Sequence, residues 1–192
     1  NIHHIVNHSG SKAVLAASSN WENMNDSKMP DVKLFMMLDN FTIIKSKNKE
    51  VNTVRERINE YFGKKYPRSF TSVDVKYHIE KPEELAVLSY TSGTTSFSKG
   101  VMIPYRSLWS NTQYAYDNIP FIHAGDNFVC MLPMAHMYGL AFEILNGINK
   151  GCHIHFLTRT PSPKVIAESF TNIKPTLILA VPLIIEKIIK SK

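Results

Sequence analysis

Residues 85–104 read LAVLSYTSGTTSFSKGVMIP, in which a loop rich in hydroxyl groups separates two apolar runs. Both apolar runs predict strands. Gly93 and Gly100 let the backbone approach a ligand closely or adopt a positive φ, and Lys99 supplies a fixed positive charge. Hydroxyl donors occupy six further positions: Thr91, Ser92, Thr94, Thr95, Ser96 and Ser98. Because ligands of open α/β sheets bind beyond the carboxyl ends of the strands, this stretch predicts a site for a phosphate group.

Two common nucleotide loops do not match this stretch. Lys99 follows Ser98 and precedes Gly100, whereas a Walker A loop has glycine before its lysine and serine or threonine after it. The chain contains no G-x-G-x-x-G for a dinucleotide. A plain surface turn is the alternative, but ten residues dense in donors and containing a lysine exceed what a turn requires. A third kind of nucleotide site is therefore expected.

Outward from the loop, apolar runs alternate with segments of helical periodicity. We expect strands at 13–17, 33–39, 85–90, 101–103, 128–133, 153–157 and 176–181, and a short one within 72–79. We expect helices at 51–63, ended by Gly63, at 108–116, at 137–148, stopped by Lys150 and Gly151, at 164–173, and from Pro182 onward, with a short helix or turn between the first two strands. Continuously apolar strands separated by helices indicate an α/β fold with a mainly parallel sheet flanked by helices.

The composition of the chain limits the functions and partners that it can have. The chain has 192 residues, of which 44% are hydrophobic, and this is enough to bury a substantial core. Its formal net charge is +6, but the lysines are scattered rather than gathered on one stripe. Nucleic-acid binding needs a clustered basic face, so we expect no nucleic-acid partner, and a nucleotide phosphate is the more reasonable anion.

The cysteines, the histidines and the first residues argue against a disulfide framework, a metal site and a signal peptide. Cys130 and Cys152 both lie in apolar segments, which predicts two buried free thiols rather than a disulfide or a metal site. His3, His4 and His8 have no acidic or cysteine partners nearby and are expected to be exposed. The start lacks a signal-peptide pattern, and no run reaches 18 apolar residues, so we expect a cytoplasmic protein.

Four stretches carry a resemblance to a known family. The loop YTSGTTSFSKGVM at 90–102 resembles the phosphate-binding signature of the adenylate-forming (AMP-binding) superfamily, whose usual form is YTSGTTGxPKGV. LPMAHMYGL at 132–140 resembles its L-P-x-x-H segment, and KPTLILAVPLIIEKI at 174–188 resembles its KPT-x5-VP helix entry. IVNHSGSKAVLAAS at 5–18 resembles an early strand. The wording of the L-P-x-x-H segment looks most like a long-chain fatty acyl-CoA synthetase.

The resemblance spans the whole chain, but the chain corresponds to only about a third of such an enzyme. We therefore expect an excised piece of the large N-terminal domain, with a leading β-α-β part and connector at 1–82 and a phosphate-loop part at 83–192. The family's Y-G-x-T-E motif for adenine and magnesium, its ribose-binding aspartate and its C-terminal domain with the catalytic lysine do not occur here. The isolated chain is expected to be inactive.

The resemblance implies that the parent enzyme activates a carboxylic acid with ATP and then forms acyl-CoA. The loop would bind the β and γ phosphates through Thr91, Ser92, Gly93, Thr94, Thr95, Ser96, Lys99 and Gly100. His136 would orient the acyl carboxylate, although a helix-capping or core histidine is the structural alternative. The implied partners and cofactors are a fatty acid, ATP, Mg²⁺ and coenzyme A. The acyl chain length, the oligomeric state and a peripheral membrane association are not determined.

Two departures from the signature matter. Ser96 stands where glycine is usual and Ser98 where proline is usual, and a serine at positive φ would cost roughly 1 kcal/mol. Tyr105 and Arg106 replace a more common threonine-histidine pair, and their role is open. Two rival readings therefore stand beside the enzyme: a nucleotide- or phosphate-binding module without chemistry, and a purely structural α/β domain that keeps a degenerate loop.

Overall fold

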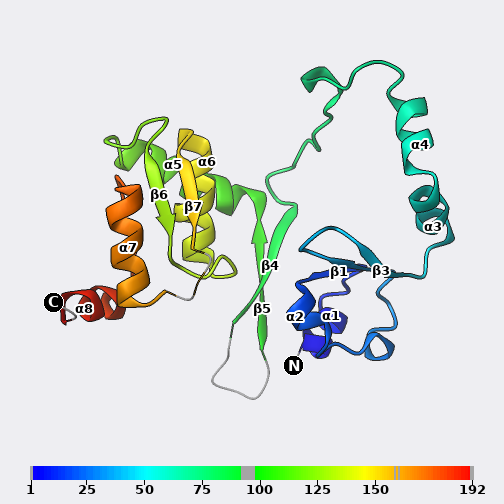
Figure 1. Ribbon diagram of the computed structural model, residues 1–192, viewed down its shortest axis with the longest axis horizontal. Coiled ribbons are helices and arrows are strands. Elements are labelled where there is room, and N and C mark those ends of the chain that lie inside the picture. Colours follow the sequence, from blue (N-terminus) through cyan, green and yellow to red (C-terminus); the bar gives the residue numbers. More distant parts are fainter. Residues whose placement is uncertain (1, 92–97, 158, 160, 191–192) are drawn as a thin grey trace. The chain divides into compact units, whose positions relative to one another are not determined.

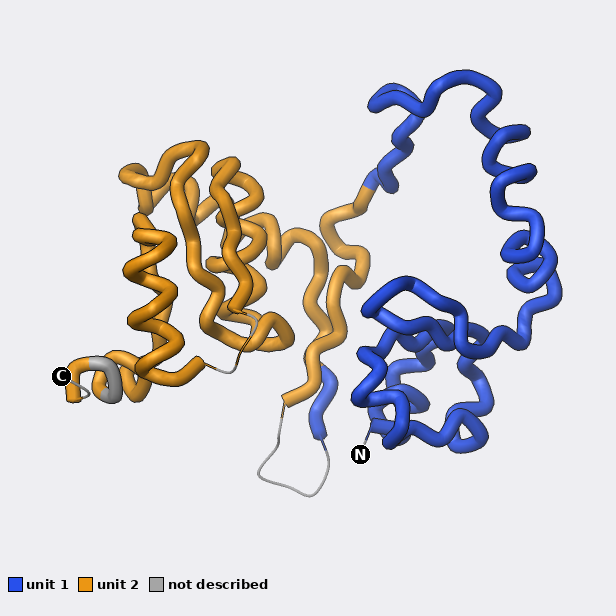
Figure 2. Tube along the Cα trace, in the orientation of Figure 1, with its two compact units in different colours: residues 1–79, 92–100 blue, residues 80–91, 101–192 orange. Residues whose placement is uncertain are grey.

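The computed structural model describes residues 2–91, 98–157, 159 and 161–190. The chain forms two compact units, one of residues 1–79 with 92–100 and the other of residues 80–91 with 101–192 (Figure 2). The boundary expected between residues 82 and 83 stays a prediction about the full-length protein. No helix in the described part of the chain is long and apolar enough to cross a membrane.

The first unit is built on a three-stranded sheet (Figure 1). Its first elements are α1 (Ile2–His8), β1 (Ala13–Ala16), α2 (Ser18–Trp21), the 3-10 helix η1 (Asp26–Lys28), β2 (Leu34–Met37) and β3 (Ile43–Ser46). Strands β1 and β2 are parallel, and β3 pairs with β2 in the antiparallel sense. The core consists of Val14, Ala16, Met29, Val32 and Phe35, so the expected β-α-β step buries the alternate residues of β1.

Two helices follow where one was expected at 51–63. These are α3 (Lys49–Glu56), which Asn48 caps by accepting from the backbone N–H groups of Glu50 and Val51, and α4 (Ile58–Lys65). The break falls at Arg57, whose φ of −124° is not helical. Gly63 lies inside α4 and does not end it, so that expectation was wrong.

The strand expected within 72–79 was also wrong. The backbone there forms the 3-10 helix η2 (Ser72–Asp74), and residues 75–79 have no regular structure. Thr71 and Asp74 form a capping box, in which the Asp74 carboxylate accepts from the backbone N–H of Thr71 at 2.9 Å. This local bonding competes with a strand ladder.

The second unit carries two further sheets of two strands each. Its elements are β4 (Leu85–Thr91), β5 (Lys99–Pro104), which begins in residues of the first unit, α5 (Tyr105–Asn118), β6 (Asn127–Cys130), the π-helix η3 (Gly139–Leu145), α6 (Asn146–Lys150), β7 (His153–Phe156), α7 (Pro163–Ile173) and α8 (Pro182–Lys190). Strands β6 and β7 are parallel. Helix α7 contacts β6 and α6 contacts β7 (Figure 1). The α/β class is confirmed, with small sheets of parallel and mixed strands.

Helix boundaries in this unit follow the expected signals. Gly151 adopts a left-handed φ of 73° directly after Lys150 and ends α6. Ser162 caps α7, and Pro182 is the first residue of α8. The strand expected at 176–181 was wrong, because only Leu177 pairs there, in a single parallel bridge to Phe128.

Candidate functional site

The phosphate loop joins two paired strands, as its position in the sequence predicts. Thr91 ends β4, and Lys99 and Gly100 begin β5, with all three residues exposed. Ser98 is half-buried directly before β5. The expected ligands Ser92, Gly93, Thr94, Thr95 and Ser96 lie outside the described residues. The roles assigned to the loop therefore stay predictions.

His136 lies on the loop between β6 and η3, and its side chain is exposed. Its backbone N–H donates to the Pro133 carbonyl at 2.9 Å, and its own carbonyl accepts from the Leu140 N–H at 3.0 Å. The imidazole is thus not a core histidine. Thr91 and His136 belong to one compact unit, whereas Lys99 and Gly100 belong to the other.

Glu143 is a buried carboxylate that sequence reasoning missed. It lies in η3, is 2% exposed, and accepts from the backbone N–H of Met131 at 3.1 Å and of Leu132 at 3.2 Å. Burial raises the pKa of this carboxyl group, while the two backbone bonds and the Cys130 thiol oppose that rise. A weak signal was present, because Glu143 and Asn146 are polar residues within the expected helix at 137–148.

Gly139 lets η3 begin directly against the loop that carries His136. A Cβ at Gly139 would lie 3.0 Å from the Pro133 carbonyl oxygen and 3.1 Å from the Leu132 Cβ. The first of these contacts is with backbone, which cannot rotate out of the way. The loop and the helix are therefore fixed against each other by close packing as well as by hydrogen bonds.

Tyr105 and Arg106, whose role the sequence left open, attach the start of α5 to the segment before β4. Their backbone N–H groups donate at 3.0 Å to the carbonyls of Glu84 and Pro82, respectively. Arg106 Nε also lies 3.1 Å from Glu83 Oε2. Both residues therefore have a structural role at the end of β5.

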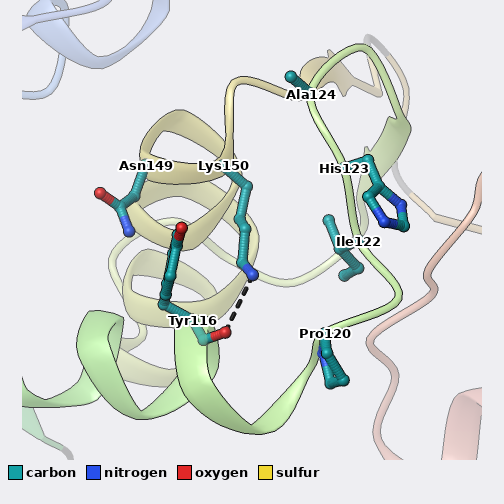
Figure 3. Close-up of a pocket in the computed structure, with 7 residues that line it drawn as sticks. All are labelled: Tyr116, Pro120, Ile122, His123, Ala124, Asn149 and Lys150. Carbon is teal, nitrogen blue, oxygen red and sulfur yellow. Dashed lines mark hydrogen bonds between the residues drawn. The ribbon is translucent and has the colours of Figure 1, made fainter.

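Two hollows in the second unit are lined by none of the expected site residues. One, of about 650 Å³, lies along α5 and includes Trp109. The other, of about 470 Å³, lies between α5 and α6 (Figure 3). Its Lys150 Nζ donates to the Tyr116 carbonyl at 3.0 Å and lies 4.0 Å from the centre of the Tyr116 ring. The cation is already engaged in joining the two helices.

The remaining candidate groups are acidic side chains, cysteines and histidines in the described part of the chain. It contains no cluster of three or more histidine, cysteine, aspartate or glutamate side chains that could hold a metal ion. Cys130 and Cys152 are free, with Cys130 buried as expected and Cys152 only half-buried. His3 is half-buried rather than exposed, and its Nε2 accepts from the Asn25 backbone N–H at 2.9 Å.

Comparison with known proteins identifies the family. The chain matches the family described as AMP-binding enzyme over residues 1–192, and it belongs to that family. It is 39% identical over 82 residues to 4-coumarate–CoA ligase 1 of Oryza sativa subsp. japonica, covering 41% of this chain and 14% of that relative. It is 28% identical over 109 residues to the long-chain-fatty-acid–CoA ligase heimdall of Drosophila melanogaster, covering 56% and 16%.

Solved structures share the fold. The N-terminal domain of FACL13 from Mycobacterium tuberculosis, in an inhibitor-bound crystal structure, superposes with a TM-score of 0.71 at 18% identity, covering 97% of this chain and 42% of that one. The O-succinylbenzoate coenzyme A synthetase of Bacillus subtilis, in complex with ATP and magnesium ion, gives a TM-score of 0.67 at 18% identity, covering 100% and 34%. The chain thus spans well under half the length of these relatives.

Proposed function

We propose that the full-length protein joins a carboxylic acid to the AMP part of ATP, giving acyl-AMP and releasing pyrophosphate, and then transfers the acyl group to the thiol of coenzyme A with release of AMP. The observation that carries this proposal is the loop at 90–102, which matches the family signature and connects β4 to β5 within a chain that belongs to the AMP-binding enzymes. A module that only binds phosphate would not need the segment at 132–140, which contains His136 and resembles the family's L-P-x-x-H segment. The enzyme is therefore preferred over the two non-catalytic readings.

The residues present fit the phosphates of a nucleotide. Lys99 would neutralise charge as pyrophosphate leaves, and the hydroxyl and backbone N–H groups of the loop would hold the β and γ phosphates: Thr91, Ser92, Gly93, Thr94, Thr95, Ser96 and Gly100. His136 would orient the acyl carboxylate from the loop before η3. These roles concern positioning and electrostatics, and they need no covalent intermediate with the protein. Mg²⁺ would accompany ATP, which the Bacillus neighbour's bound ATP and magnesium support.

We propose a fatty acid as the substrate. The wording LPMAHMYG at 132–139 and the Drosophila fatty-acid ligase support this choice. A 4-coumarate-like aromatic acid is the alternative, which the 39% identity to the Oryza ligase favours over its 82 residues. Since the matched segment covers only 14% of that relative, the acid must be established on the full-length protein.

The test is carboxylate-dependent exchange between ATP and pyrophosphate, measured on the full-length protein with acids from acetate to palmitate and with 4-coumarate. We expect exchange that peaks with one long-chain acid. Lys99→Ala should reduce it at least about a hundredfold, since a positive charge beside the leaving pyrophosphate would contribute roughly 3 kcal/mol. Lys49→Ala, an exposed lysine at the start of α3, is the matched control and should leave exchange unchanged.

The outcomes separate the readings. A maximum with 4-coumarate would replace the fatty acid by an aromatic acid and leave the activation step intact. No exchange with any acid would contradict the enzyme and favour a binding module, with Ser96 and Ser98 as the first substitutions to revert.

A further inference from the structure

Glu143 has no described partner that would explain its charge. The side chain is 2% exposed, and no ion pair joins it to a lysine, arginine or histidine within the described ranges. A buried carboxylate is costly unless hydrogen bonds compensate for its lost hydration. An apolar side chain of similar length would fill the same space without that cost. The carboxylate must therefore be explained by the groups that it binds.

Those groups are the Cys130 thiol and, directly after it, the two N–H donors that follow the last paired residue of β6. The ladder between β6 and β7 ends at Cys130, which lies opposite Phe156. The next two N–H groups, of Met131 and Leu132, leave the sheet in buried residues and donate to the Glu143 carboxylate. Without an acceptor, each buried donor would cost about 1–3 kcal/mol. Glu143 thus replaces the missing strand partner at the point where the chain turns.

A continuous set of contacts leads from this carboxylate to His136. Leu132 and the Pro133 carbonyl lie against Gly139, the first residue of η3. The Pro133 carbonyl accepts from the His136 N–H at 2.9 Å, and the His136 carbonyl accepts from the Leu140 N–H at 3.0 Å. The loop is therefore attached at its start by Glu143 and at its end by the first turn of η3, and His136 lies between the two attachments.

We infer that Glu143 is a positioning residue that fixes the loop bearing His136, so that the imidazole meets the carboxylate of the acyl substrate. Because Glu143 is buried among protein groups, it acts through His136 and not by touching substrate. The inference rests on the proposed function of His136 in orienting the acid. It assigns to η3 a role beyond covering the sheet. Helix η3 supplies the Glu143 carboxylate as the acceptor at one end of the loop and the Leu140 N–H as the donor at the other end.

The test is a double-mutant cycle on the full-length protein with Glu143→Met, His136→Ala and their combination. Glu143→Met should raise the KM for the acid about tenfold or more and leave the KM for ATP unchanged, because the loop attachment is lost while the phosphate loop is intact. In the His136→Ala background the same change should add less than about twofold, because groups that act as one unit are not additive. Glu143→Gln, which keeps one acceptor oxygen, should give an intermediate effect.

Two controls separate positioning from general destabilisation. Glu168→Met removes an exposed glutamate of α7, which pairs with Arg159, and should change neither KM. The NMR resonance of the His136 ring, assigned by its loss in His136→Ala, should shift in Glu143→Gln and stay in place in Glu168→Met. That readout applies even if a variant is inactive, and the isosteric glutamine serves if Glu143→Met does not fold.

The results distinguish this inference from the proposed function. An unchanged acid KM in Glu143→Met, or losses that simply add in the double mutant, would overturn the positioning role. An unshifted His136 resonance in Glu143→Gln would overturn it as well. If the unmodified protein shows no exchange with any acid, the proposed function fails, and the resonance alone then decides whether Glu143 holds the loop.

Discussion

Cys130, the last residue of β6, has its thiol beside the Glu143 carboxylate. Burial, together with that neighbouring carboxylate, raises the pKa of the Cys130 thiol to about 12. Because the thiolate is the reactive form, we expect iodoacetamide at pH 8 to leave Cys130 unmodified in the folded chain and to label it readily in urea. Mass spectrometry of the labelled peptides measures both rates.

Cys152 provides the internal comparison for that experiment. It is half-buried, burial also raises the pKa of its thiol, and the thiol donates to the His123 carbonyl at 3.6 Å. Its greater exposure should make it react faster than Cys130. Equal rates at the two positions in the folded chain would contradict the burial of Cys130.

At the scale of elements, three glycines in helical segments have different surroundings. Gly139→Ala in η3 should lower the free energy of unfolding by about 1–3 kcal/mol, because the new methyl group would meet the Pro133 carbonyl oxygen at 3.0 Å. Gly63→Ala in α4 should raise it by up to about 1 kcal/mol, since no atom lies within 4 Å and alanine favours the helix. Urea denaturation followed by circular dichroism measures both changes.

Gly147 is the matched control for the η3 glycine. Its added methyl group would meet Ile154 Cδ1 and Cγ1 at 3.1 Å and Phe128 Cδ2 at 3.3 Å, all of them side-chain atoms that can shift more easily than backbone. Gly147→Ala should therefore cost less than Gly139→Ala. A larger loss at Gly147 would show that backbone contact does not decide the order.

The elements also show how far the sequence could predict the fold. Periodicity gave η3 with α6 as one helix, but an apolar stripe reports burial and not the charge of Glu143 within it. Strand β3 was missed because the turn before it lacks the usual glycine and instead places Phe41 at a φ of 58°. The apolar run at 176–181 reads as a strand, yet tertiary context leaves it with one bridge. Short apolar runs do not determine their own pairing.

For a similar reason, the sequence predicted some residues of the candidate site and missed others. Composition predicted a phosphate site at 91–100, because glycines, hydroxyls and Lys99 follow an apolar run, and this stays a prediction because residues 92–97 lie outside the described part of the chain. His136 required the family resemblance, since a lone histidine carries no specific signal. Glu143 is marked in the sequence only as a polar residue within an expected helix, and its role was missed because its backbone partners are brought within reach only by the three-dimensional structure.

At the scale of the whole molecule, each compact unit has its own buried core. The first contains Phe35 and Met29, and the second contains Val129, Met131 and Ile166. The expected site residues are divided between the units, with Lys99 in one and His136 in the other. The roles expected of these residues therefore stay predictions about the full-length protein.

The last prediction concerns the 192 residues alone. The superposition with the Bacillus synthetase covers 100% of this chain but only 34% of that one, so most of such an enzyme has no counterpart here. We expect the isolated chain to form no acyl-adenylate under conditions in which the full-length protein does, since binding phosphates without fixing the adenine and the acid supplies little of the required positioning. Trapping the activated acyl group with hydroxylamine at equal protein concentrations measures both. Robust hydroxamate formation by the isolated chain would mean that these 192 residues suffice for the activation step.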